Sequence, residues 1–401
     1  MLQGKSILLG ISGGIAVYKA AELLRLFVKA GASVHVVMTE NAQRFVTPLT
    51  FQALSNNPVG CELFSMQSES QISHIQKARL PDLVVLAPAT ANLMAKMAAG
   101  IADDLLTTIL LAATAPVLVC PAMNVKMWEH PATRRNLRTL TELGYKIEPP
   151  ASGFLACQEE GAGRLAELCD IFESALRLLT PPTLAGRSVL ISAGPTREYF
   201  DPVRFLSNPS SGKMGYALAR IAARRSAKVV LVSGPVSLDC PSGVERVCVA
   251  SALQMRDAIV ELSAQQDAIV MTAAVSDYRP SELSAQKIKK SAEGFSVRFE
   301  PNPDILASLG QTKPPGQVLV GFAAETQNVF ENAKDKLIRK NLDLIVANDL
   351  AKEGAGFGLD TNQVKIIGRN REPIDLALMT KDEVACEIWD RVERLLSGGE
   401  N

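Results

Sequence analysis

The sequence predicts an α/β protein of two domains, each built on a parallel β-sheet with helices on its faces. From Lys5 onward, short runs rich in β-branched residues alternate with longer helical stretches, which is the pattern of βαβ units. The 401 residues, with 47% hydrophobic content, are more than one compact domain usually holds. After the proline pair Pro181 and Pro182, the run Gly186–Leu190 restarts the pattern of Gly4–Leu8, which places the domain boundary there.

The first domain, residues 1–182, is expected to hold a flavodoxin-like parallel sheet. A helix is predicted at Ile15–Ala30, and a last helix near Glu167–Leu179 ends at the linker that contains the proline pair. The strands are predicted at Ser6–Gly10, Ser33–Met38, Leu83–Ala87, Val117–Cys120 and Tyr145–Glu148.

The second domain, residues 187–401, is expected to be another Rossmann-like, nucleotide-binding α/β fold. It opens with the run Gly186–Leu190, and a closing helix is predicted around Lys381–Leu396. Further strands are predicted at Val229–Ser233, Ile269–Ala273, Val318–Phe322 and Leu344–Ala347.

Composition excludes several classes of partner. The 42 basic and 42 acidic residues cancel, so no global field attracts nucleic acid or a membrane surface, and anionic ligands must be met locally. Seven scattered cysteines without a CxxC pair are typical of a reducing cytosol. Since the chain shows neither a signal peptide nor a membrane-spanning run, we expect a cytoplasmic protein.

Polar and glycine-rich segments follow the strands of the first domain. Ser12-Gly13-Gly14-Ile15 lies between the first strand and its helix, where amides and the helix dipole favour a phosphate. The spacing is not GxGxxG, so a mononucleotide is favoured over a dinucleotide, although a tight turn that merely needs glycine has the same pattern. Because the carboxyl ends of parallel strands meet at one edge, the later segments converge on the same crevice. These are Thr39–Asn41, Pro88–Asn92 and Pro121–Trp128.

Two further features of the first domain concern proton transfer. His74 is one of only three histidines, and imidazole exchanges protons near neutral pH, although a histidine between isoleucines is more often a packing residue. The segment Ala151–Arg164 is too glycine-rich for a regular helix or strand and carries Cys157. It is expected to be a lid over substrate, the alternative being an ordinary mobile connection.

PATAN and PAMNVKMW resemble the PASANT and PxMNxxMW motifs of the homo-oligomeric flavin-containing cysteine decarboxylases, and the segment around Cys157 is similar to that family's closing segment. The resemblance implies FMN. The chain departs from the family at Leu93, where a threonine is usual. By position, the residues expected to meet the flavin are Ser12, Gly13, Gly14, Ile15, Thr39, Glu40, Asn41, Thr90, Ala91, Asn92, Leu93 and Ala122.

The resemblance also implies a decarboxylation of 4'-phosphopantothenoylcysteine. Loss of CO₂ from a cysteinyl carboxylate needs an electron sink, which a flavin supplies by temporarily oxidising the thiol side of the substrate. The resemblance assigns His74 as the base, Asn124 as the group that holds the substrate carboxylate, and Cys157 as the proton donor.

The second domain carries an anion cradle and clustered lysines. The segment Arg204–Gly215 opens a helix after the first strand. The upstream glycine of a P-loop is missing and Met214 occupies the position of its Ser or Thr, so the P-loop motif is rejected. Lys287–Lys290 and the helical pair Lys336 and Lys340 offer positive charge for a polyphosphate, although a lysine cluster is usually a solvated surface.

AAVSDYRP, KIKK, NPDI, GFAAET and FGLDTN together resemble the phosphopantothenate-cysteine ligases. The resemblance implies an acyl-cytidylate formed from CTP with Mg²⁺ or Mn²⁺, with Asn208 and Lys287 catalytic and Asp277 on the metal. Pro209 replaces a more familiar basic residue. By position, the residues expected to contact CTP are Ala273, Asp277, Lys287, Pro303, Asp304, Ile305, Leu306, Phe322, Lys336 and Lys340.

The sequence therefore predicts an enzyme that ligates cysteine to 4'-phosphopantothenate and decarboxylates the product to 4'-phosphopantetheine. The resemblance implies trimeric decarboxylase domains and paired ligase domains, hence a homo-oligomer that is a dodecamer. An NAD(P)-dependent oxidoreductase with two Rossmann domains is the alternative, against which the missing GxGxxG argues.

Overall fold

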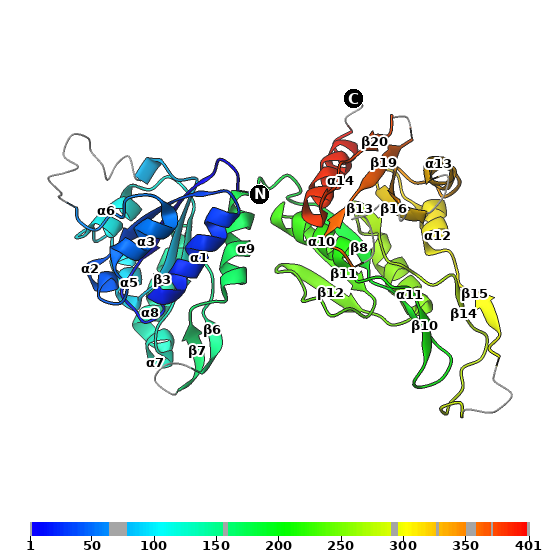
Figure 1. The fold of residues 1–401 in the computed structure, drawn as a ribbon, viewed down its shortest axis with the longest axis horizontal. Coiled ribbons are helices and arrows are strands. Elements are labelled where there is room, and N and C mark those ends of the chain that lie inside the picture. The colour runs from blue at the N-terminus through cyan, green and yellow to red at the C-terminus, as the bar shows by residue number, and fades with distance from the viewer. Residues whose placement is uncertain are drawn as a thin grey trace. The chain divides into compact units, whose positions relative to one another are not determined.

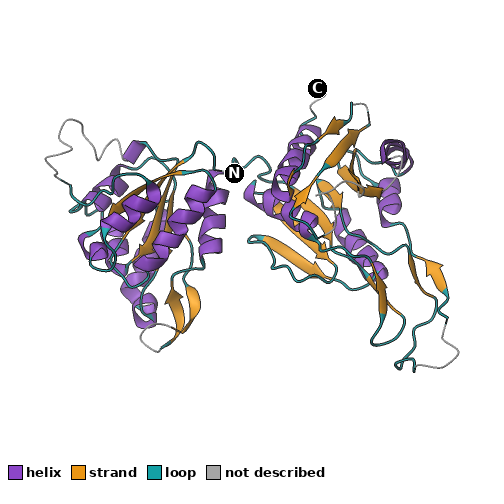
Figure 2. Cartoon of the chain, viewed as in Figure 1, coloured by secondary structure: helices purple, strands orange, loops and turns teal. Residues whose placement is uncertain are grey.

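The computed structural model of the protein describes residues 2–63, 78–154, 159–289, 296–325, 329–349, 358–369 and 372–398. The chain forms two compact units, Met1–Pro181 and Pro182–Asn401, which we call unit 1 and unit 2. Each unit is a β-sheet flanked by helices (Figures 1 and 2). Among the described helices, none has the length and apolar character needed to cross a membrane.

Unit 1 contains a five-stranded sheet in the order β2-β1-β3-β4-β5, with all neighbours parallel. This is the flavodoxin-like order, which confirms the predicted fold class. Its elements are β1 (Ser6–Ile11), α1 (Val17–Lys29), β2 (Ser33–Met38), α2 (Glu40–Gln43), α3 (Pro48–Ser55), β3 (Leu83–Ala89), α5 (Ala91–Ala99), α6 (Leu105–Ala112), β4 (Val117–Pro121), α7 (Val125–Glu129), α8 (Pro131–Glu142), β5 (Lys146–Ile147), β6 (Ala151–Phe154), β7 (Glu160–Arg164) and α9 (Leu168–Leu179).

The sheet of unit 1 is buried on both faces. Successive residues of a strand point to opposite faces, so Ile7 and Leu9 of β1 join one apolar cluster while Leu8 joins another. The first cluster includes residues of α1 and α9, and the second includes residues of α5 and α6. Burial on both faces explains why the strands read as continuous apolar runs in the sequence.

Unit 2 contains an eight-stranded sheet in the order β12-β11-β8-β13-β16-β17-β19-β20. Its first six strands have the 3-2-1-4-5-6 order of a Rossmann fold, and β19 and β20 extend one edge antiparallel. The elements are β8 (Ser188–Ala193), β9 (Arg197–Tyr199), β10 (Phe205–Ser207), α10 (Lys213–Arg224), β11 (Lys228–Ser233), β12 (Val244–Cys248), α11 (Ala252–Ser263), β13 (Ala268–Met271), β14 (Tyr278–Pro280), β15 (Phe299–Pro301), α12 (Ile305–Thr312), β16 (Val318–Glu325), α13 (Val329–Arg339), β17 (Leu344–Asp349), β18 (Thr361–Asn362), β19 (Val364–Gly368), β20 (Ile374–Asp375), β21 (Met379–Thr380) and α14 (Lys381–Leu396).

The predicted closing helix of unit 2 is α14, and it anchors one face of the sheet. Trp389 is fully buried, and its indole N–H donates to the carbonyl oxygen of Leu218 on α10 at 2.9 Å. Residues of α10 and α14 share an apolar cluster with Val189 and Ile191 of β8, whereas Leu190 belongs to the cluster on the other face.

The glycine-rich segment of unit 1 forms a hairpin where we expected neither helix nor strand. In the described part of it, β6 and β7 pair antiparallel, with Ser152 opposite Ala162 and Phe154 opposite Glu160. Glycine is needed at Gly161 because a Cβ there would lie 3.0 Å from a methyl group of Val125 on α7. The glycines thus allow the hairpin to pack closely against α7, and the expectation of an irregular segment was wrong.

At three places in the chain, an aspartate carboxylate joins the amino-terminal ends of two neighbouring strands. Asp82, just before β3, accepts hydrogen bonds from the backbone N–H of Ser6 (2.8 Å) and from Lys5 Nζ (3.1 Å). In unit 2, Asp267 accepts from the backbone N–H of Ser188 (2.8 Å) and from Arg187 (2.9 Å). The Gly-Lys/Arg-Ser run at the start of each unit is therefore repeated because its Lys or Arg side chain and its Ser backbone N–H bind the same kind of carboxylate in both units.

The third instance lies before β17, where Asp343 accepts from the backbone N–H of Leu319 (2.7 Å) and from Lys313 (2.7 Å). Asp82 and Asp267 are stabilised as anions, because both have a pKa below the ordinary value of 3.8. Burial favours the protonated form of Asp267, but hydrogen bonds from Ser188 and Arg187 outweigh it and hold the pKa below its ordinary value of 3.8.

We predict that Asp267→Asn destabilises unit 2 by about 1–2 kcal/mol at pH 7, because it weakens two hydrogen bonds to a charged acceptor. The contribution of a carboxylate with a lowered pKa is present above its unfolded pKa and disappears as the pH falls through its folded pKa. The difference between the two proteins should therefore vanish in acid. Urea unfolding followed by Trp389 fluorescence in a Trp128→Phe background measures it, and an undiminished difference at low pH would contradict the assigned cause.

Candidate active sites

Unit 1 holds a pocket of about 460 Å³ at the carboxyl ends of β1, β3 and β4, which we call the unit 1 pocket. It lies where the strand order reverses next to β1, the position at which doubly wound sheets bind ligands. It is lined by Gly13, Gly14, Ile15, Ala16, Tyr18, Lys19, Thr90, Ala91, Ala122, Met123, Asn124, Met127, Phe154, Gly163, Arg164 and Leu165.

Ser12 holds the loops after β1 and β3 together beneath this pocket. The buried Ser12 hydroxyl donates to the carbonyl oxygen of Pro88 at 2.8 Å and accepts from the backbone N–H of Thr90 at 2.9 Å. Thr90 in turn caps α5 by accepting from the backbone N–H of Leu93. The Gly13-Gly14 turn is thus fixed beside the start of α5, where helix amides favour an anion.

Close packing at Gly13 completes the floor. A Cβ on Gly13 would lie 2.4 Å from the Cβ of Asn41 and 2.7 Å from its carbonyl carbon. Asn41 therefore shapes the pocket by supporting the turn from behind, and Thr39 caps α2 with its side chain. Of the residues predicted to meet the flavin, Ser12, Thr39, Glu40, Asn41, Asn92 and Leu93 do not line the pocket. Leu93 is instead buried in the core.

Asn124 is placed in the unit 1 pocket by the start of α7. Its side-chain oxygen accepts from the backbone N–H of Lys126 at 2.7 Å, which caps the helix, and its Nδ2 donates to Glu159 at 2.6 Å. Both the oxygen and the nitrogen of the Asn124 amide are thus hydrogen-bonded, which fixes the orientation of its side-chain N–H groups. His74 and Cys157 lie outside the described residues.

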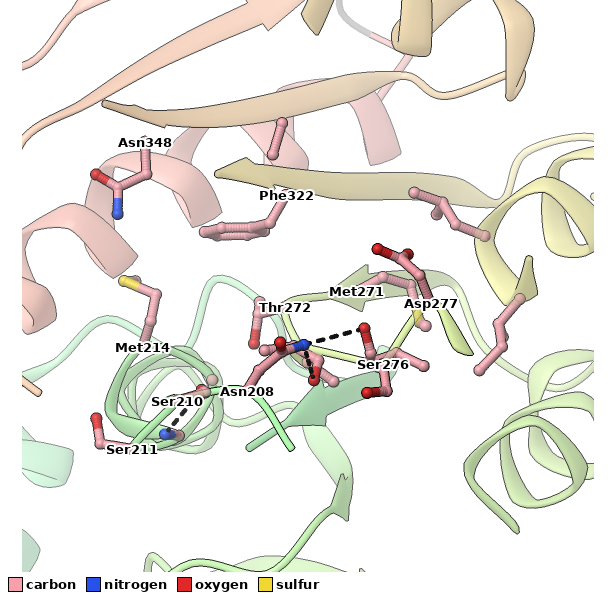
Figure 3. Close-up of a pocket in the computed structure, with 18 of the residues that line it drawn as sticks. Asn208, Ser210, Ser211, Met214, Met271, Thr272, Ser276, Asp277, Phe322 and Asn348 are labelled. Atoms are coloured by element: carbon pink, nitrogen blue, oxygen red, sulfur yellow. Dashed lines mark hydrogen bonds between the residues drawn. The ribbon is translucent and has the colours of Figure 1, made fainter. Parts of the chain in front are cut away.

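The pocket of unit 2, about 660 Å³, lies over the strand-order reversal between β8 and β13. We call it the unit 2 pocket. Every residue predicted to contact CTP lines it except Lys287, which is exposed beyond β14. The residues brought together are Asn208, Ala273, Asp277, Pro303, Asp304, Ile305, Leu306, Phe322, Lys336 and Lys340. Asn208 and Phe322 lie on opposite walls, while Asn348 and Asp277 lie toward opposite ends (Figure 3).

Asn208 is fixed by the loop that follows β13. Its Nδ2 donates to the carbonyl oxygens of Ala274 at 3.1 Å and Val275 at 3.3 Å, as the dashed lines in Figure 3 mark. The same loop is held from the other side, because Asn302 donates to the carbonyl oxygen of Ser276 at 2.8 Å. The loops that follow β10, β13 and β15 therefore form one hydrogen-bonded wall.

Close helix packing brings the α10 amides to this wall. A Cβ on Gly215 would lie 2.5 Å from the Cβ of Ala193 and 2.6 Å from Thr272 Oγ1. Only glycine allows this approach, which seats the first turn of α10 between the ends of β8 and β13.

Asp304 and Lys340 form an ion pair at one end of the unit 2 pocket, with Lys340 Nζ 2.7 Å from the carboxylate. Asp304 also caps α12 by accepting from the backbone N–H of Ala307 at 3.0 Å. Burial favours its protonated form, but the hydrogen bonds from Lys340 and Ala307 outweigh it and hold the pKa below 3.8. Asp304 thus fixes a lysine at the pocket while remaining ionised.

Several lining residues are not among those predicted. In the unit 1 pocket, Lys19 and Arg164 supply positive charge. In the unit 2 pocket, Asn348 and Lys381 are such residues, while Lys213 belongs to the predicted anion cradle and Asn362 to the motif FGLDTN. Within the described residues, no group of three or more His, Cys, Asp or Glu side chains could hold a metal ion by itself.

Comparison with known proteins covers almost the whole chain. Residues 1–180 match the family described as Flavoprotein, and residues 184–396 match the DNA/pantothenate metabolism flavoprotein C-terminal domain. The Coenzyme A biosynthesis bifunctional protein CoaBC of Bacillus subtilis (strain 168) is 50% identical over 399 residues, which cover 98% of each chain. The protein of the same name from Escherichia coli (strain K12) is 47% identical over 98% of this chain and 97% of its own. A solved structure of the CoaBC C-terminal domain is 43% identical, covers 54% of this chain and 100% of its own, and has a TM-score of 0.47.

Proposed function

The chain belongs to the CoaBC family of bifunctional coenzyme A biosynthesis proteins, and from that premise we propose the reaction of each unit. Unit 2 ligates cysteine to 4'-phosphopantothenate through an acyl-cytidylate made from CTP, and unit 1 decarboxylates the product to 4'-phosphopantetheine. The observation that carries this proposal is that each unit has its own pocket at a strand-order reversal, lined by the motif residues for one activity. Family membership favours this function over a two-domain NAD(P)-dependent oxidoreductase.

We propose that the unit 1 pocket takes FMN. Its features suit a mononucleotide: a glycine turn against Asn41, a helix start at Thr90, and the cations Lys19 and Arg164 at an otherwise apolar pocket. Bound FMN would supply a temporary acceptor for the electrons of the substrate. Asn124 would orient the substrate carboxylate through its side-chain N–H groups, while His74 and Cys157, by resemblance, would move protons.

In unit 2, Asn208 would stabilise the acyl-cytidylate, and Lys336 and Lys340 would neutralise the nucleotide phosphates. Asp277 would hold Mg²⁺ or Mn²⁺ together with those phosphates, since such ions are often bound by one carboxylate plus substrate oxygens. Lys287 does not line the pocket, so its proposed role in transfer requires its exposed segment to approach the site.

We also propose a homo-oligomer, a dodecamer of trimeric decarboxylase and dimeric ligase domains. Large apolar side chains exposed at the unit 1 pocket support an interface there: Ile15 (64% exposed), Tyr18 (57%), Met127 (48%) and Phe154 (69%). A cytoplasmic location is supported by the free thiols of Cys120, Cys169, Cys240, Cys248 and Cys386. Light scattering of the purified protein measures the assembly.

One variant in each unit, with both activities measured in each variant, tests the proposed activities of unit 1 and unit 2. Asn124→Asp keeps the cap of α7 but replaces the N–H donor with a negative charge, so decarboxylation of phosphopantothenoylcysteine should fall about 100-fold or more. Asn208→Ala should reduce CTP-dependent pyrophosphate release by a similar factor. Each variant should retain the other activity and thereby controls for folding. The proposal fails if the parent makes no phosphopantetheine with any nucleotide, or if both variants lose both activities while folded.

FMN binding is tested at Gly13. Gly13→Ala should expel FMN or weaken its binding, because the added methyl group would displace Asn41 or the turn itself. The measurement is the visible absorbance of flavin retained per chain after gel filtration. Pyrophosphate release by unit 2 should be unchanged, and a variant that keeps full flavin content would refute the proposed floor of the pocket.

A further inference from the structure

Asp201 is a fully buried carboxylate in the loop between β9 and β10. Its Oδ1 accepts hydrogen bonds from the backbone N–H groups of Val203 (2.8 Å) and Arg204 (2.7 Å), which closes the turn of that loop. Its Oδ2 accepts from Nε (2.9 Å) and Nη2 (2.5 Å) of Arg204. Asp201 and Arg204 thus form a charge-assisted pair, which we call the Asp201–Arg204 pair.

The Asp201–Arg204 pair also holds a segment that lies far along the chain. Asp201 Oδ2 accepts from the backbone N–H of Ile288, 87 positions away, at 3.2 Å, and Arg204 Nη2 donates to the carbonyl oxygen of Ile288 at 2.7 Å. A second contact lies close by, where the backbone N–H of Ser284 donates to the carbonyl oxygen of Phe200 at 3.1 Å. Two points of contact therefore join these parts of the chain, on the side of unit 2 where Figure 1 shows β10, β14 and β15.

We call residues 281–289 the lysine segment, because it carries Lys287. The side chain of Lys287 is exposed and lies outside the described lining of the unit 2 pocket. Both backbone polar groups of the next residue, Ile288, are bound, so the main chain at Lys287 is held and its four-carbon side chain remains free to rotate. A lysine held in this way loses less conformational entropy on reaching a ligand than a lysine in a free loop.

One short strand connects this anchor to Asn208. β10 begins directly after Arg204, ends directly before Asn208 and pairs with β9. β9 is fixed in turn, because the buried carboxylate of Glu198 accepts from the backbone N–H of Ala252 at 2.9 Å. Asn208, which lines the unit 2 pocket, and the lysine segment are therefore attached to opposite ends of β10. The lysine segment thus approaches the pocket together with this hairpin and not as an independent loop.

The charge of Asp201 is needed for the contact with Ile288. Burial favours the protonated form of Asp201, but hydrogen bonds from Arg204, Val203 and Ile288 outweigh it and hold the pKa well below the ordinary value of 3.8. Both oxygens of the ionised group accept. An asparagine could keep the two bonds at Oδ1, but its amide nitrogen could not accept from Arg204 or Ile288.

Resting on the ligase function proposed above, we propose that Asp201 is a positioning residue for the transfer of the acyl group to cysteine, because it holds Lys287 in register with Asn208. Asp201 is not among the described residues that line the unit 2 pocket, so it acts through the lysine segment.

The transfer step defines what Lys287 must do. The cysteine amine nitrogen forms the amide bond to the acyl carbon, and the bond from that carbon to the phosphate oxygen breaks. CMP leaves with the electron pair of the broken bond, and the amine loses a proton to solvent. The ammonium group of Lys287 would neutralise the negative charge that develops, which requires it to be in place when the bond breaks.

The test measures the two half-reactions separately in single turnovers. Pyrophosphate release from CTP and phosphopantothenate without cysteine reports formation of the acyl-cytidylate, and amide formed after addition of cysteine reports the transfer. Asp201→Asn should slow the transfer about tenfold or more, the loss expected for a misplaced catalytic group. Formation of the acyl-cytidylate should stay close to the parent rate.

A double-mutant cycle with Lys287 separates positioning from a merely structural role. Lys287→Met should slow the transfer, and adding Asp201→Asn to Lys287→Met should cause no further loss, because Asp201 acts through that lysine. If Asp201 only stabilised the fold, its loss would slow both half-reactions and would add to that of Lys287→Met.

Asp267→Asn is the matched control. Asp267 also binds one arginine and one backbone N–H, but it lies at the amino-terminal ends of the strands. This variant should keep the parent ratio of the two half-reaction rates. If Asp201→Asn fails to fold, judged by Trp389 fluorescence in the Trp128→Phe background, Ile288→Pro decides. It removes the N–H that Asp201 binds without changing Asp201, and the same selective loss is expected.

An equal slowing of both half-reactions in folded Asp201→Asn would overturn the assignment, as would an additive loss in the double variant or a parent transfer rate in Lys287→Met. Failure of the proposed function is a different result, in which the parent itself releases no pyrophosphate from CTP. Limited digestion with trypsin then tests the anchor directly, because the bond cut after Lys287 carries the N–H that Asp201 binds. Asp201→Asn should be cut there several-fold faster than the parent. Equal rates would refute the anchor.

Discussion

Both pockets exist because the order of parallel strands reverses beside the first strand of each unit. At that point one helix leaves toward one face of the sheet and the next helix toward the other, so the loops diverge and a crevice remains. In unit 1 the loops after β1 and β3 bound it, and in unit 2 the loops after β8 and β13 do so. Ser12 ties the ends of β1 and β3 together through Pro88 and Thr90, and Thr272 ties the end of β13 to β8 by donating to the carbonyl oxygen of Ser192.

At the amino-terminal ends of the strands, opposite the pockets, aspartate carboxylates join neighbouring strands. Asp82, Asp267 and Asp343 each accept a hydrogen bond from a backbone N–H at or next to the first residue of a neighbouring strand. Each also binds a cation, Lys5, Arg187 or Lys313. The amino-terminal ends of the strands are thus held together by side chains, while the carboxyl ends remain open for ligands. The same contact in both units explains why the runs Gly4–Leu8 and Gly186–Leu190 look alike.

The parts of the fold predicted from sequence are those with a local signal. Strands such as Leu83–Ala89 are buried on both faces and therefore read as apolar runs, and motif residues at their carboxyl ends meet by topology. Contacts across long sequence separations carry no such signal. The bond between Lys213 and Asp360 joins residues 147 positions apart, so it was not predicted, although Lys213 itself lies in the predicted anion cradle. Lys381 was not predicted at all. The hairpin of β6 and β7 was missed because its glycines serve packing against α7.

A chain without net charge must create positive potential locally, and the unit 2 pocket does so with lysines that are already paired. Lys340 is held by Asp304, whose side chain is 50% exposed, and Lys213 by Asp360, whose side chain is 88% exposed. Because exposed ion pairs are weak, Asp360 holds Lys213 only loosely, whereas Asp304 also caps α12 and is itself fixed. The two lysines that give this pocket positive charge are therefore held to different degrees by their carboxylate partners.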